Sequence, residues 1–124
     1  MRTHAISLFA SAALASSWVH AAEPTDVSML QLIVQPEKYH GKFIRVQGFL
    51  RLEFEGKALY LHREDYANGL TKNGLWVDML ESPEHMKLNM RYVLIEGVFN
   101  ARDHGHLGLW SGSIEKISRA ISTK

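Results

Sequence analysis

Between residues 28 and 35, apolar residues recur at helical spacing. Three apolar residues between positions 30 and 34 fall on one helical face, and Ser28 with Gln31 has the spacing of a capping box. A proline follows, and the residue before a proline is pushed out of helical conformation. The pattern predicts one short helix that begins after Ser28 and ends before a turn over residues 36–41.

From residue 43 the spacing changes to alternation, which is typical of a half-buried strand. One predicted face carries Ile44, Val46, Leu50, Leu52 and Phe54, and the other carries Arg45, Gln47, Arg51, Glu53 and Glu55. Gly48 lies in the middle of this stretch, where a glycine often marks a bulge or a bend. Glu55 and Gly56 then predict a hairpin, with residues 57–61 as the returning strand.

The second half of the chain predicts three more strands separated by polar loops. Residues 75–80 and 90–99 have strand patterns, and a single helical turn is expected over residues 63–66. The last segment also fits helical spacing, because its isoleucines recur every three or four residues. A fifth strand over residues 109–117 is favoured, since it would pair an otherwise open sheet edge.

Five short strands with a bent first and fourth member predict a mainly β fold. We expect a small five-stranded OB-like barrel with a short N-terminal helix, because a sandwich needs about seven strands. A resemblance adds to this expectation, and it is carried by turn and core residues: Val27, Ser28, Leu32, Ile33, Pro36, Glu37, Tyr39, Gly41, Lys42, Arg45, Val46, Gly48, Phe54, Glu55, Gly56, Glu64, Asp65, Tyr66, Lys72, Asn73, Gly74, Leu75, Trp76, Gly105, His106 and Gly108. At these positions the chain resembles small exported bacterial proteins with an OB-like barrel. The resemblance covers most of residues 26–121, implies only the fold and assigns no functional residue. We expect a single OB-like domain over residues 28–121.

The N-terminal segment predicts export. Arg2 precedes an uncharged, mainly apolar stretch over residues 5–15, and a peptidase site follows at Ala21. This stretch is too short to span a bilayer. We therefore expect residues 1–21 to be a secretory signal peptide, residues 22–27 to be a loose lead-in, and the protein to be periplasmic or extracellular.

Composition narrows the classes of function. The chain has 124 residues, 14 Lys+Arg against 13 Asp+Glu, and no cysteine. General nucleic-acid binders carry an excess of positive charge, and this chain has a net charge near zero, so a nucleic acid is an unlikely partner. The absence of cysteine excludes disulfides, thiolate metal sites and cysteine nucleophiles. Removing 21 residues, Arg2 among them, leaves a formally neutral domain of 103 residues whose stability must come from its core.

Two sets of residues are candidates for chemistry on this domain. Asp103, His104 and His106 lie together on a glycine-rich loop and could ligate a divalent metal such as zinc, with a further ligand from elsewhere. A solvated turn is the competing interpretation. The segment that starts at His62 contains acids and bases that could bind a polar ligand, although its acids could instead cap a helical turn.

The ligand-binding candidates are Phe49, Arg51, Trp76 and His62. Phe49 and Arg51 are placed on the solvent face of the first hairpin, where OB folds bind oligonucleotides or sugars. The competing and favoured interpretation is a mixed-charge surface that keeps this face of the sheet soluble. Trp76 alternates against apolar neighbours and would anchor a partner on the outer face. We therefore expect an exported, non-catalytic binding module for an envelope protein or a small ligand. The alternative is a metal-binding protein or metallohydrolase that uses His104 and His106.

Overall fold

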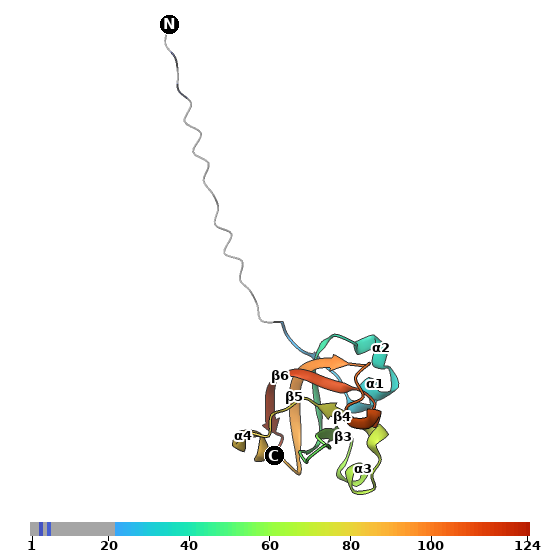
Figure 1. Cartoon of the computed structure of the whole chain (residues 1–124). Coiled ribbons are helices and arrows are strands. Elements are labelled where there is room, and N and C mark those ends of the chain that lie inside the picture. The colour runs from blue at the N-terminus through green and yellow to red at the C-terminus, as the bar shows by residue number, and fades with distance from the viewer. Residues whose placement is uncertain (1–2, 4, 6–21) are drawn as a thin grey trace.

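Five strands form one closed barrel, as the computed structural model shows (Figure 1). The structure describes Thr3, Ala5 and residues 22–124, so the predicted signal peptide otherwise lies outside the described residues. The barrel strands are β2 (Phe43–Arg51), β3 (Ala58–Tyr60), β4 (Gly74–Val77), β5 (Arg91–Asn100) and β6 (Ser113–Ser122). The segment that fitted both helix and strand is thus a strand, and it begins and ends later than residues 109–117.

The order of the strands identifies the barrel type. The sheet runs β2-β3-β4-β6-β5, and β5 pairs back with β2 to close it. β4 and β6 are parallel, whereas the other barrel pairs are antiparallel. A five-stranded barrel with this mixed pairing is the predicted small OB-like barrel, and the mainly β fold class is confirmed.

β2 serves two neighbours, and glycine makes this possible. The strand pairs with β5 along residues 43–50 and with β3 from Phe49 onward. A Cβ at Gly48 would lie 2.6 Å from the carbonyl oxygen of Tyr60, so glycine lets β3 come close to β2. Pairing with β5 continues through Gly48 without a shift, whereas the register of β5 and β6 shifts around Gly97. The bulge therefore lies at the second glycine.

The barrel interior is filled by apolar side chains from every strand. Its buried members include Ile44, Val46, Leu50, Leu52, Leu59, Leu75, Val77, Val93, Ile95, Phe99 and Ile114. Phe54, predicted for this inner face, is instead exposed, because β2 ends at Arg51 and the alternation of a strand no longer applies in the following loop. The interior is thus a packed apolar core, and none of the predicted ligand-binding or metal-ligating residues belongs to it.

The helices are short, with four to six residues each. α1 (Met29–Val34) begins with the predicted capping box, in which the Ser28 hydroxyl accepts from the Gln31 amide. Residues expected to form a turn make α2 (Pro36–Tyr39), while α3 (Arg63–Ala67) and α4 (Pro83–Met86) occur in the predicted loops. None of the helices in the part that the structure describes has the length and apolar character needed to cross a membrane.

The lead-in over residues 22–27 differs from its prediction. Thr25–Asp26 form a two-residue strand, β1, parallel to β2, and the amide of Val27 donates to the Arg45 carbonyl at 3.0 Å. Asp26 also contacts the Arg45 guanidinium at 3.2 Å. The segment is thus paired with the barrel from Thr25 onward, rather than loose.

Candidate functional site

A second apolar cluster lies on the outside of the barrel, over β2, β3 and β4. We call it the outer aromatic layer, and its members are buried Phe49, Ala58, Tyr60 and Trp110 with partly buried Tyr66 and Trp76. Strand residues alternate between faces, so Ala58 and Tyr60 point outward while Leu59 between them belongs to the core. The layer has one end at Phe49 and another at Trp76.

The Phe49 end is sealed. Phe49 is 0% exposed, and the rings of Tyr66 and Tyr92 have centroids 6.1 Å and 5.4 Å from its own. The guanidinium carbon of Arg63 lies over the ring, 5.1 Å from the centroid. The prediction that Phe49 is an exposed ligand-binding residue is therefore wrong, because α3 supplies Arg63 and Tyr66 as a cover.

Two further ligand-binding candidates also have structural partners. Arg51 donates to the Tyr66 hydroxyl at 3.0 Å and to the Asn89 side chain at 3.2 Å, and it pairs with Glu53 at 3.2 Å. His62 directly precedes α3, and its backbone amide donates to the carboxylate of Asp65 at 2.9 Å. The acid of this segment thus fixes the start of a helical turn, as the competing interpretation expected. Neither Arg51 nor His62 lines the cleft described next.

The Trp76 end of the layer opens into a cleft of about 470 Å³. The cleft lies between the β2–β3 loop, residues 52–57, and the β5–β6 loop, residues 101–112. Its lining residues are Phe54, Glu55, Lys57, Trp76, Glu81, Asp103, Gly105 and His106. In OB folds the loops between the first two and the last two barrel strands flank the binding face, and these are the corresponding loops here.

Close packing holds the Trp76 indole in this position. Its cross-strand neighbours are Ala58 and Ser113, whose small side chains leave room for the ring. A Cβ at Gly105 would lie 2.7 Å from three ring atoms of Trp76, so the glycine backbone packs directly against the indole. Trp110 packs at a tilt, with a centroid separation of 5.1 Å. One end of a rigid aromatic layer is thereby presented to the cleft.

The charged groups of the cleft are mainly acidic. Glu55, Glu81 and Asp103 line it, against one lysine and one histidine. Lys57 donates to the carbonyl of Met79 at 3.0 Å, and its ammonium lies 5.9 Å from the Trp76 centroid. His106 approaches the carboxylate of Glu55 at 3.3 Å. A cation or a hydrogen-bond donor therefore suits this cleft better than a phosphate does.

The predicted metal ligands do not converge on one point. His104 contacts the carbonyl of Trp110 at 2.8 Å through Nδ1, and Asp103 accepts from the Gly105 amide at 3.0 Å. His106 instead approaches Glu55, and Asp103 and His106 line the cleft while His104 does not. Within residues 22–124, no group of three His, Asp or Glu side chains could hold a metal ion. The loop does not fit the three-ligand site that this hypothesis requires.

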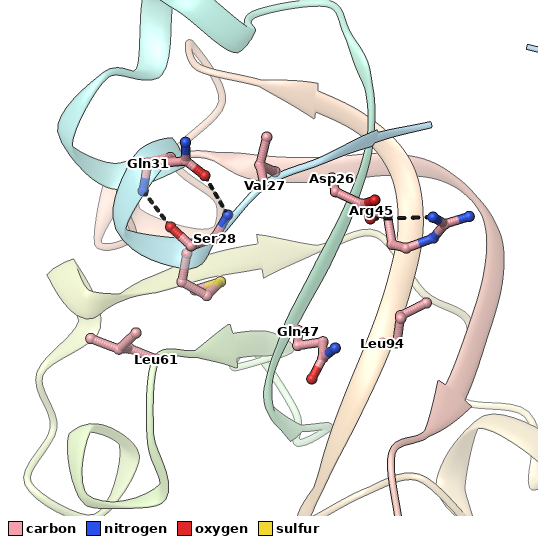
Figure 2. Close-up of a pocket in the computed structure, with 9 residues that line it drawn as sticks. Asp26, Val27, Ser28, Gln31, Arg45, Gln47, Leu61 and Leu94 are labelled. Carbon is pink, nitrogen blue, oxygen red and sulfur yellow. Dashed lines mark hydrogen bonds and ion pairs between the residues drawn. The ribbon is translucent and has the colours of Figure 1, made fainter. Parts of the chain in front are cut away.

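A larger hollow, of about 560 Å³, lies between β1, α1 and the outer faces of β2 and β5 (Figure 2). Figure 2 shows two pairs among its polar groups: Ser28 with Gln31 in the capping box, and Asp26 with Arg45. The hydrogen bond from Arg45 to Glu96 is the main reason that the pKa of Arg45 is raised, with Asp26 contributing. These contacts give Asp26, Ser28, Gln31 and Arg45 structural roles in the fold.

Of the predicted site residues, the structure brings Trp76, Asp103 and His106 together. The other cleft residues were not among the predicted site residues: Phe54, Glu55, Lys57, Glu81 and Gly105. Glu55 and Gly56 predicted a turn, and that turn was the available signal that Phe54 lies beyond the strand. No protein-family model, no curated protein and no solved structure matches the chain.

Proposed function

We propose that the protein is a non-catalytic binding module of OB-like fold that receives its ligand in the cleft beside Trp76. The observation that carries the proposal is the position of a fixed, half-buried indole between the two loops that flank the binding face of OB folds. The volume of the cleft is within the range of ligand pockets, about 300–1,000 Å³, and the cleft combines apolar surface with a few polar groups.

We also propose that the protein is exported and that it is similar to small exported bacterial proteins with an OB-like barrel. Its support is the sequence of residues 1–21, with Arg2, an apolar stretch and a peptidase site. An envelope protein or a small envelope ligand would then be the partner. N-terminal sequencing of the protein recovered from the periplasm or medium tests this part, and a chain that retains residues 1–21 there contradicts it.

Nuclear magnetic resonance on the full chain tests the binding site. The indole N–H signal of Trp76 is assigned with Trp76→Phe and followed while probes of different classes are added: chitohexaose, lysine-containing peptides, oligo-dT and zinc chloride. We expect at least one organic probe to shift this signal and to lose affinity in Phe54→Ala, whose exposed side chain can be removed without unfolding.

Two results would contradict the proposed site. Organic probes that shift only signals outside the cleft would place binding elsewhere. Stoichiometric zinc binding with shifts confined to His104 and His106 would favour the metal alternative. The matched control is Val34→Ala, which removes an exposed apolar side chain from α1 and should leave the Trp76 response unchanged.

A further inference from the structure

The most exposed large apolar side chains of the described residues either line the proposed cleft or directly adjoin a lining residue in the sequence. Phe54 is 85% exposed, and Leu80 and Leu107 are each 79% exposed, which are the largest values for any large apolar side chain in residues 22–124. Phe54 lines the cleft, Leu80 precedes the lining residue Glu81, and Leu107 follows the lining residue His106. Three separate loops that contribute lining residues to this cleft thus each carry a large apolar side chain in water.

This exposure has a cost that a soluble domain normally avoids. Large apolar side chains gathered on one face commonly mark a site of protein–protein contact. Leu107 also has a φ of 57°, in the left-handed region that favours glycine and asparagine over leucine. Burial of these exposed apolar side chains by a partner would lower the free energy of the complex.

The carboxylates of the cleft define the charge of that partner. Glu81 forms no ion pair among residues 22–124, and Glu55 has only the half-exposed contact with His106. Asp103 uses one carboxylate oxygen for the Gly105 amide. Lys57 forms no ion pair with these acids in the described residues, since its ammonium donates to the Met79 carbonyl. An incoming cation would therefore meet carboxylates that retain acceptor capacity, beside the indole of Trp76.

We propose, resting on the proposed function, that the ligand of the cleft is a polypeptide segment in which a lysine or arginine is flanked by apolar residues. The basic side chain enters between Glu81, Asp103 and Glu55 along the indole of Trp76. Its apolar neighbours cover Phe54, Leu80 and Leu107. A sugar would use Trp76 and the carboxylates but would leave the two leucines in water, and a nucleic acid would bring phosphates toward three acids.

Selection from a phage-displayed library of random peptides tests this inference with the full chain immobilised. We expect enriched sequences to place lysine or arginine next to leucine, phenylalanine or similar residues. Synthetic copies of them are then titrated against variants. Glu81→Lys should weaken binding at least about tenfold through charge reversal, whereas the matched control Glu64→Lys, on α3, should leave it unchanged.

Leu107→Asn tests the apolar part without risk to the fold. Asparagine accepts the left-handed conformation better than leucine, so we expect unchanged or increased stability together with about tenfold weaker peptide binding. Val34→Asn, at an exposed position of α1, is the control and should not change peptide affinity. Weakening by Glu81→Lys and Leu107→Asn, but not by the controls, supports the inference.

The failures of the two proposals can be told apart. Enrichment of acidic or uncharged peptides, or of none, would overturn the basic–apolar inference. If chitohexaose or another probe still shifts the Trp76 indole signal, the cleft remains the binding site and only its ligand class is wrong. If neither peptides nor the other probes shift that signal, the proposed function fails as well.

Discussion

Two phenylalanines five residues apart have opposite surroundings, and they represent two regions of the molecule. Phe49 is fully buried under α3, whereas Phe54 is 85% exposed at the edge of the cleft. Their positions along the alternating pattern suggested the reverse. Alternation assigns a residue to one face of a strand, but it does not tell what covers that face or where the strand ends.

The same contrast holds for the two ends of the outer aromatic layer. At the Phe49 end, Arg51 and Arg63 contact aromatic groups of the protein itself, which leaves little for a ligand. At the Trp76 end, loops from three places in the sequence bring acids and the exposed side chain of Phe54 to an open cleft. One chemistry, aromatic rings with charged groups, thus stabilises the fold at one end and is available for binding at the other.

Removal of each phenylalanine gives the largest test of this comparison. We expect Phe49→Ala to lower the free energy of unfolding by about 3–5 kcal/mol, because it leaves a cavity between the barrel and α3. Phe54→Ala should change it by less than about 0.5 kcal/mol, since the side chain is in water. Denaturant unfolding of both variants measures the difference. Similar losses in the two variants would refute the assignment of a sealed and an open end.

The fold could largely be predicted from the sequence, because local patterns determine most of it. The capping box at Ser28, the hairpin after β2 and the strand spacing each depend on residues close together in the chain. Two features depend on distant residues instead. Phe49 is buried by residues of α3, and β1 forms by pairing with Ile44 and Arg45 of β2. Sequence spacing contains no information on such contacts.

The candidate site was predictable only in part for the same reason. Trp76 stood out because a tryptophan alternated with core residues, and the loop with Asp103 and His106 stood out by its composition. The partners of each one come from other loops: Glu55 opposes His106, and Gly105 packs on Trp76. A loop rich in histidine therefore suggested a metal, although its side chains have separate partners.

Two glycines of the β5–β6 loop sharpen the description of the open end. Gly105→Ala should lower the free energy of unfolding by about 2–3 kcal/mol, because the methyl group would overlap the Trp76 ring in addition to straining a φ of 69°. Gly108→Ala has nearly the same φ, 67°, but no atom within 4 Å of the new methyl group. It should cost about 1 kcal/mol. Equal costs would contradict the close packing of Gly105 on Trp76.

A variant of Arg51 tests whether this residue of the sealed end stabilises the fold or binds a ligand. We expect Arg51→Met to lower the free energy of unfolding by about 1–2 kcal/mol, because the Tyr66 hydroxyl and the Asn89 side chain each lose a donor. The response of the Trp76 indole signal to a bound probe should stay as in the original chain. A variant with unchanged stability and lost probe binding would return Arg51 to the ligand-binding set.

Tyr60 connects the two ends, and its titration gives the smallest expected effect. Burial raises the pKa of Tyr60 above its ordinary value of 10.0, although the hydrogen bond from the Trp110 indole, at 3.4 Å, acts in the opposite direction. The folded state thus favours the neutral phenol, so this contribution to stability is complete below pH 10 and is lost as the pH rises through the higher folded pKa.

At about pH 7, Tyr60→Phe should be less stable by up to about 1 kcal/mol, since Trp110 loses its acceptor. At about pH 11 the difference should shrink or change sign, because phenylalanine does not ionise while the other tyrosines are common to both proteins. Denaturant unfolding at the two pH values measures this change, and a constant difference would show that Tyr60 is open to water as Trp76 is.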